Sequence, residues 1–207
     1  MDFHRHHWIG YVAVLGVLFL LMGCGSQRAY LIVDYQVPAQ SQQLQGQRVR
    51  LQVTDSRSDP YILSPAVARQ FEGFQDRYSL AWVTTDKKRT IVGEHDLMGL
   101  FQAAFQKRLE ALGVTVVAAD QYGAPLFQVD LHGLKVDQKD RDWVAQMSYT
   151  ASLSKDNMLI ASETVKGSAQ RTKIIGRKGA DQTLSDIFSD IINRLDVVSL
   201  FKKAELI

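Results

Sequence analysis

The stretch DLMGLFQAAFQKRLEALG, residues 96–113, does most to decide the fold. Its apolar side chains recur every three or four residues, the spacing that places them on one face of an α-helix. Those side chains are Leu97, Phe101, Ala104, Phe105, Leu109 and Leu112. Asp96 is a suitable N-cap and Gly113 a suitable C-terminal stop. We therefore expect an amphipathic helix here, lying with its apolar face on a sheet.

A second stretch of the same kind, TLSDIFSDIINRLDVVSLF at residues 183–201, lies near the end of the chain. Its apolar positions again lie three or four apart, which predicts a second helix with one apolar face. They are Leu184, Ile187, Phe188, Ile191, Ile192, Leu195 and Val198. Two helices with a single apolar face each can both cover the same side of a sheet.

The remaining segments supply the strands of that sheet. RVRLQVTD at residues 48–55 alternates apolar and polar residues, as a strand with one buried face does. After the first helix come VTVVAA, LFQVDLHGLKV, VAQMSYTASLS and MLIASETVKGSAQ. Charged connectors that contain Asp favour antiparallel hairpins between the last three. We therefore predict an α+β fold, a two-layer sandwich whose mixed, mostly antiparallel sheet has about four to five strands, with two helices on one face.

The chain divides into three ranges. We expect residues 1–23 to be a leader, residues 24–46 to be a lipidated N-terminus and tether, and residues 47–207 to be a single α+β domain. YLIVDYQV within the second range could form a short strand, but a proline and a Gln/Ser run after it favour irregular chain. Residues 60–92 are expected to be a structured insertion, in which SLAWVTT and TIVG flank a charged turn as the strands of a hairpin do.

The stretch LFLLMGCGSQ, residues 18–27, bears on where the protein resides. It closes an uncharged run, residues 8–22, that would span about 22 Å as a helix, less than the roughly 30 Å of a bilayer core. The length favours a secretory signal over a membrane span. An anchor made by an unusually short helix is the alternative.

Leu21, Met22, Gly23 and Cys24 resemble a bacterial lipobox, in which an aliphatic, a tolerant and a small residue precede a cysteine. Cys24 is the only cysteine, so it cannot form a disulfide within the chain. The resemblance implies cleavage before Cys24, which would carry an S-diacylglycerol and an N-acyl group such as palmitate, enough for stable anchoring. Gly25 follows, and the absence of Asp there resembles the pattern of release to the outer membrane.

The sequence contains no recognisable catalytic motif. His95 precedes a helix and His132 lies within a strand pattern, far apart in the sequence, and neither has the spacing of a metal site or of a nucleophile motif. Asp55 and Asp59 are near neighbours, but Arg57 between them argues against a calcium loop. We therefore expect no enzyme activity, no cofactor and no metal; a periplasmic hydrolase is the less favoured alternative.

Charge limits the choice of partner. Lys and Arg total 24 against 22 Asp and Glu, a net charge of +2 that gives no reason to expect nucleic acid. The basic residues of two predicted loops could contact anionic lipid headgroups or lipopolysaccharide phosphates if the fold gathers them on one side. They are Lys87, Lys88, Arg89, Arg177 and Lys178. The alternative is that they are ordinary solvated loop residues.

Four features together resemble the YajG-type bacterial lipoproteins. They are the lipobox ending in Cys24, a first strand running into DSRSD, a 97–112 helix closing with LGVTVV, and the TLSDIFSDII helix. LptE-like and ABC-transport auxiliary lipoproteins are neighbouring families with similar two-layer folds. The resemblance implies a lipoprotein of the Gram-negative outer membrane, facing the periplasm, and supplies no catalytic residues. We therefore expect an accessory or binding protein that acts as a protein-interaction module in envelope assembly or transport; direct binding of lipid or lipopolysaccharide is the alternative.

Overall fold

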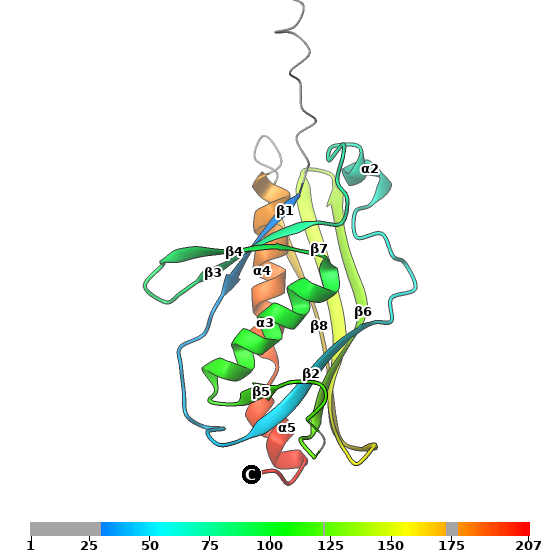
Figure 1. Ribbon diagram of the computed structural model, residues 1–207. Helices are drawn as coiled ribbons and strands as arrows, with labels where there is room; N and C mark the ends of the chain where they lie inside the picture. The colour runs from blue at the N-terminus through cyan, green and yellow to red at the C-terminus, as the bar shows by residue number, and fades with distance from the viewer. Residues whose placement is uncertain (1–29, 122, 173–177) are drawn as a thin grey trace, which may run out of the picture.

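Two β-sheets and the helices that cover them make up the fold (Figure 1). The computed structural model describes residues 30–121, 123–172 and 178–207. In chain order the elements are β1 (Leu31–Gln36), β2 (Arg48–Asp55), α2 (Pro65–Ala68), β3 (Tyr78–Val83), β4 (Arg89–His95), α3 (Leu97–Ala111), β5 (Thr115–Val117), β6 (Leu126–Lys139), β7 (Asp142–Lys155), β8 (Met158–Thr172), α4 (Lys178–Arg194) and α5 (Val197–Lys203). This arrangement confirms the α+β class expected from the sequence.

The larger sheet contains five strands in the order β5-β2-β6-β7-β8. Strand β2 pairs in parallel with both β5 and β6. The parallel pairing with β5 is possible because helix α3 carries the chain back before β5 begins. Strands β6, β7 and β8 are joined as two long antiparallel hairpins, as their charged connectors predict. The antiparallel pairings are much longer than the parallel ones, so this is the mixed, mostly antiparallel sheet that we expect.

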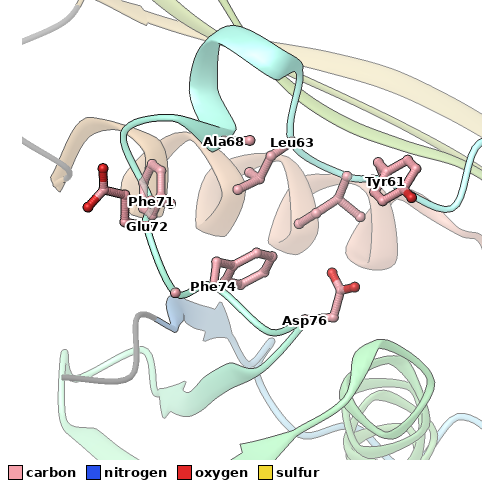
Figure 2. Close-up of a pocket in the computed structure, with 9 residues that line it drawn as sticks. Tyr61, Leu63, Ala68, Phe71, Glu72, Phe74 and Asp76 are labelled. Atoms are coloured by element: carbon pink, nitrogen blue, oxygen red, sulfur yellow. The ribbon is translucent and has the colours of Figure 1, made fainter. Parts of the chain in front are cut away.

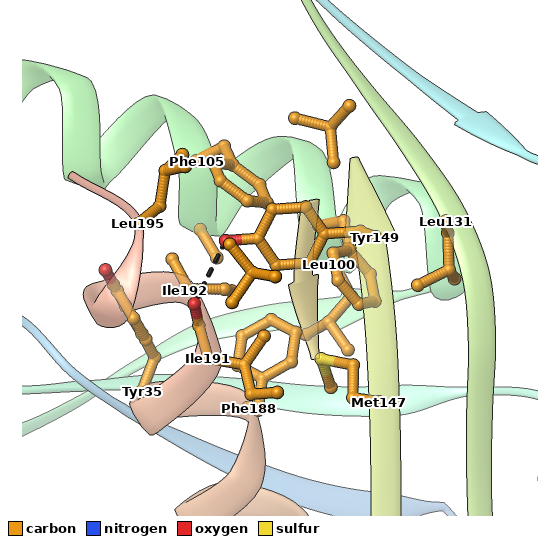
Figure 3. Packing of buried hydrophobic residues seen from close by; sticks show 14 of the residues in the cluster. Tyr35, Leu100, Phe105, Leu131, Met147, Tyr149, Phe188, Ile191, Ile192 and Leu195 are labelled. Carbon is orange, nitrogen blue, oxygen red and sulfur yellow. Dashed lines mark hydrogen bonds between the residues drawn. The ribbon is translucent and has the colours of Figure 1, made fainter. Parts of the chain in front are cut away.

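Both long helices pack on the same face of the larger sheet, where Tyr149 of β7 contacts each of them (Figure 3). The ring of Phe105 in α3 meets the Tyr149 ring edge-on, with the centroids 5.2 Å apart. The Tyr149 hydroxyl donates a hydrogen bond to the carbonyl oxygen of Ile191 in α4, at 3.0 Å. The helices also meet directly through Phe101 and Phe188, whose ring centroids lie 5.1 Å apart. The core therefore lies between this face and the two helices.

The apolar face predicted for the first helix is buried in α3, but the second stretch forms two helices instead of one. Helix α4 ends at Arg194 and α5 begins at Val197. Asp196 explains the break, because its carboxylate accepts a hydrogen bond from the Ser199 N–H at 2.8 Å and so caps α5. A short acidic side chain favours the start of a helix over its interior.

The segment expected to be a tether is instead part of the core. Strand β1 pairs in parallel with β3, and β3 forms the expected hairpin with β4, giving a second sheet in the order β1-β3-β4. Its alternate side chains, from Leu31 to Tyr35, are fully buried. The tether predicted over 24–46 is therefore wrong from residue 31 onward, and the domain begins there, ahead of residue 47. The reason is the period-two alternation of β1, which buries every second side chain once β3 lies beside it.

The other edge of β1 is covered by polar side chains of α4. Every second residue of the strand donates its backbone N–H to a side chain one helical turn further along α4. The pairs are Ile32 with Asp181, Asp34 with Ser185 and Gln36 with Ser189, at 3.0, 2.9 and 2.9 Å. Two strand residues rise by about 6.6 Å and four helical residues by about 6.0 Å, so the two repeats stay nearly in step over three contacts. An edge that would otherwise expose unpaired backbone groups is thereby closed.

Candidate functional site

The predicted lipid-attachment site lies outside the described residues. Cys24 and the lipobox residues Leu21, Met22 and Gly23 all precede residue 30. Lipidation of Cys24 therefore stays a prediction. No helix within residues 30–121, 123–172 and 178–207 is long and apolar enough to cross a membrane.

The basic residues predicted to contact headgroups come from separate parts of the fold. Lys87 and Lys88 lie in the exposed turn between β3 and β4. Arg89 opens β4, and its guanidinium pairs with the Asp34 carboxylate at 2.9 Å. Lys178 is the first residue of α4, at the opposite end of that helix from α5 and away from the β3–β4 turn (Figure 1), while Arg177 lies outside the described residues. A headgroup role for these residues stays a prediction.

The two histidines considered for a hydrolase lie in different surroundings. His132 interrupts the β6–β7 register, and its Nε2 atom lies 2.9 Å from the Thr150 hydroxyl on the solvent-facing side of the sheet. His95 ends β4, and its Nε2 atom is buried without a hydrogen-bond partner among the described residues. A serine-type triad needs a carboxylate that orients the imidazole. In the described part of the chain no carboxylate bonds to either ring.

A pocket of about 340 Å³ opens between two irregular segments of the 60–92 range (Figure 2). It is lined by Tyr61, Ile62, Leu63, Ala68, Phe71, Glu72, Gly73, Phe74 and Asp76. Helix α4 lies behind it in Figure 2. A volume of this size is within the range of about 300–1,000 Å³ that is usual for small-ligand sites.

Backbone hydrogen bonds hold the first wall of the pocket. The Val136 N–H of β6 donates to the Ile62 carbonyl oxygen at 2.6 Å, and the Ser64 N–H donates to the Val136 carbonyl oxygen at 3.0 Å. This segment thus extends the larger sheet beyond the end of β2. Ser64 also caps α2, since its hydroxyl accepts a hydrogen bond from the Val67 N–H. The wall is therefore fixed to the sheet and to the first turn of a helix.

The second wall is a tight loop, residues 71–76, with two left-handed residues. Gly73 has φ +80° and Asp76 has φ +51°. The ring of Phe74 meets the ring of Tyr78 edge-on, at a centroid distance of 5.8 Å, while Phe71 packs against the buried Trp143 in the same way. These contacts fix the two phenylalanine rings before any ligand arrives.

The lining combines aromatic surface with negative charge. Ile62, Leu63 and Phe71 are buried and form an apolar floor, and Tyr61 stands 73% exposed at the rim. The carboxylate of Asp76 points into the cavity, whereas Glu72 points away from it (Figure 2). No Lys, Arg or His belongs to the lining.

Arg57, the cation nearest in sequence to the first wall, pairs with Asp55 and also interacts electrostatically with the pocket residue Asp76. Its Nε and Nη2 atoms donate to the two carboxylate oxygens of Asp55, both at 2.8 Å, and its side chain is only 6% exposed. These hydrogen bonds lower the pKa of Asp55 below its usual value. Asp59 is likewise engaged, because the Lys135 ammonium contacts its carboxylate at 2.6 Å. Two ion pairs therefore hold residues 55–59, the segment considered above as a calcium loop, and they engage both of its aspartates.

This pocket is not predicted by the sequence analysis. We expect residues 60–92 to be a structured insertion, and the structure places several of their aromatic residues around a cavity. The signal present in the sequence is the close spacing of Phe71 and Phe74 around a glycine, in a stretch with no helical or strand period.

Comparison with known proteins gives only distant similarities. No family model and no curated protein matches the chain. Among solved structures, protein XCC0632 from Xanthomonas campestris, of the family DUF330, has a TM-score of 0.48 at 14% identity, over 85% of this chain and 99% of that one. An uncharacterized protein has a TM-score of 0.44 at 13% identity, over 80% and 95% of the two chains. Lipoprotein GNA1162 from Neisseria meningitidis has a TM-score of 0.26 at 12% identity, over 71% and 99%. The resemblance to YajG-type proteins stays a prediction.

Proposed function

We propose that this chain is a lipid-anchored accessory protein of the bacterial envelope, whose α+β domain binds a partner protein close to the membrane surface. One observation carries the proposal: the folded domain begins almost directly after the predicted lipid-attachment site. Strand β1 starts at Leu31, and only residues 25–30 separate it from Cys24. The seven Cα-to-Cα steps from Cys24 to Leu31 reach at most about 25 Å when fully extended. An acylated Cys24 would therefore hold the domain close to the headgroups.

The pocket lies near the end of β1 that follows the anchor. The Leu31 N–H donates to the Arg77 carbonyl oxygen at 3.2 Å, and Arg77 directly follows the pocket residue Asp76. In Figure 1 the start of β1, α2 and the first turn of α4 lie at the same end of the molecule. A partner embedded in or lying on the membrane could reach a pocket in this position.

Intact-mass measurement of the full chain, expressed in a Gram-negative host, tests the anchor. The wild-type protein is expected to lose residues 1–23, to gain the mass of the acyl groups and to sediment with outer-membrane fragments. A Cys24→Ala chain is expected to keep its leader and to gain no acyl mass. Recovery of the wild-type mature mass from the variant, or of unacylated wild-type protein in the periplasm, would contradict the proposal.

In vivo cross-linking tests the partner. The acylated wild-type chain is expected to give one reproducible cross-link to an envelope protein. Loss of that cross-link in the Cys24→Ala chain would show that membrane attachment brings the two together. Repeated recovery of the acylated chain with no cross-linked protein would count against an interaction role.

A further inference from the structure

Strand β4 forms an open edge of the smaller sheet. Among the described residues it pairs only with β3, whereas α4 closes the opposite edge, along β1, through three side-chain hydrogen bonds. In Figure 1 the hairpin of β3 and β4 projects from the side of the domain. Ile91 and Val92 of β4 are 66% and 41% exposed. An edge strand of this kind can accept a further strand.

The backbone groups that β4 presents at this edge follow from the pairing of β3. The Leu31 N–H of β1 donates to the Arg77 carbonyl oxygen, and the Val37 N–H donates to the Val83 carbonyl oxygen. The odd-numbered residues of β3 therefore direct their backbone groups toward β1, and the even-numbered residues direct theirs toward β4.

The same alternation continues into β4. The residues of β4 that stand opposite the even-numbered residues of β3 are Thr90, Gly93 and His95. Arg89, Ile91 and Glu94 stand opposite residues of β3 that face β1, so their own N–H and C=O groups point outward, to the open edge. These three residues are the hydrogen-bonding positions available to a further strand.

A β-bulge at Val92 puts the same three residues on one face of the sheet. The register with β3 skips one residue, since Leu80 lies opposite Gly93 and Ala81 lies opposite Ile91. Residues an odd number of positions apart normally point to opposite faces of a sheet. The extra residue of the bulge returns Glu94 to the face of Arg89 and Ile91.

This geometry makes the edge complementary to itself. A two-fold axis normal to the sheet, between residues 91 and 92, sets two copies of β4 antiparallel and places Arg89 of one opposite Glu94 of the other. The outward backbone groups of those two residues then face each other, and Thr90 lies opposite Gly93. Each pair shares one face only because both copies carry the bulge; a regular strand in this register would place them on opposite faces.

The charges at the two ends of β4 favour the same arrangement. Residues 86–89 carry three cations and one carboxylate, whereas residues 94–96 carry two carboxylates. Arg89 reaches across β3 to Asp34, but Lys88 and Glu94 make no ion pair within the described residues. Antiparallel pairing brings the basic end of each copy to the acidic end of the other, and parallel pairing would bring like charges together.

We infer that the open edge of β4 binds β4 of a second copy of this chain, antiparallel about that two-fold axis. Two copies then share one continuous sheet in the order β1-β3-β4-β4-β3-β1. One short pair of strands buries little surface, so the dimer is expected to be weak and to form as the protein concentration rises. The pairing needs neither the lipid nor the partner protein of the proposed function.

Sedimentation velocity of the full chain, with nonionic detergent micelles always in excess of protein, tests the pairing. The wild type is expected to pass from one copy to two as its concentration is raised. Ile91→Lys is expected to stay a single copy, because it sets like charges against each other beside the axis. Met158→Lys is the matched control, since Met158 is also 66% exposed but begins β8. A wild type that is monomeric at every concentration, or equal association of the two variants, would overturn the inference.

Amide-resolved hydrogen exchange tests the register. The amides of Arg89, Ile91 and Glu94 are expected to exchange about tenfold more slowly where the dimer forms, because pairing buries their N–H groups. The Thr90 amide already faces β3, so its exchange is expected to change less. Protection that arises along β8 and spares β4 would refute the choice of strand.

Charge reversal tests the direction of the strands. Lys88→Glu and Glu94→Lys both change exposed residues, and each is expected to weaken the dimer by about fivefold, because like charges then meet at both ends of the pair. The two changes in one chain are expected to restore association, since opposite charges meet again. A double variant weaker than either single one would refute the antiparallel arrangement. Protection of the β4 amides only after envelope extract is added to a monomeric chain would assign the edge to another protein and overturn the inference.

Discussion

Replacing Ser189 by Ala should destabilise the domain measurably, because this hydroxyl closes the edge of β1. Ser189 is 5% exposed, and its hydroxyl accepts a hydrogen bond from the Gln36 N–H at 2.9 Å and donates one to the Asp34 carbonyl oxygen at 3.2 Å. Leaving a buried donor unsatisfied costs about 1–3 kcal/mol. The better helix propensity of Ala returns roughly 0.5 kcal/mol. The net loss in the free energy of unfolding is therefore about 0.5–2.5 kcal/mol.

Urea denaturation, thermal unfolding and amide hydrogen exchange measure this loss of stability. A loss of that size lowers the midpoint of thermal unfolding by roughly 1–10 °C in a domain of this length. The amide proton of Gln36 should also exchange faster, whereas amides in the middle of β7 should not, because their pairing is untouched.

Two other serines provide the comparison. Ser185→Ala removes a similar contact with Asp34, but Ser185 is half-buried, so water replaces part of the lost bond and the cost should be smaller. Ser199→Ala, in α5, should be neutral or slightly stabilising, because within the described residues only the Ser199 backbone N–H, and not its hydroxyl, makes a hydrogen bond. If Ser189→Ala were as stable as Ser199→Ala and exchange at Gln36 were unchanged, the closure of this edge by α4 would not contribute to stability.

Three other predictions test the core, the ion pair and the start of the domain. Tyr149→Phe should cost about 1–2 kcal/mol in urea denaturation, because it leaves the buried carbonyl oxygen of Ile191 without its donor. Arg57 lowers the pKa of Asp55, so this pair contributes stability above the unfolded pKa of Asp and loses it as the pH falls through the lower folded pKa; acid titration of Asp55→Asn should therefore show a shallower loss of stability below about pH 4 than the wild type. Deleting residues 31–36 should abolish cooperative thermal unfolding, whereas a true tether could be removed without loss.

The elements that the sequence predicts well are those whose burial follows a local period. Helix α3 is predicted correctly because Phe101, Phe105 and Leu109 repeat on one face and an N-cap precedes them. The long hairpins of β6 to β8 are predicted from alternation and charged turns. In these segments, neighbouring residues alone determine which side chains face the core.

Strand β1 and the pocket, which the sequence analysis misses, depend on residues far along the chain. Residues 31–36 form strand β1 because they pair with residues 78–83. Their alternation of apolar and polar side chains is short, and the proline and glutamines that follow favour irregular chain. The break before α5 has a local signal, since Asp196 directly follows an apolar position and can cap a new helix. The local sequence signal for the pocket is weaker, because one of its walls is positioned by the backbone of Val136, far along the chain, and only the other wall is formed by the 71–76 loop.

Strand β1 couples the proposed anchor to the pocket. It follows Cys24 after only residues 25–30, and it lies between β3 on one side and the polar side chains of α4 on the other. A strand held on both edges cannot move independently of the domain, so a lipid at Cys24 would limit the distance of the whole fold from the membrane. Since β3 follows the pocket loop directly and pairs with β1, the same constraint would keep the pocket near the membrane surface. A partner on that surface would then meet the domain at a high effective concentration, which favours binding even where the intrinsic affinity is modest.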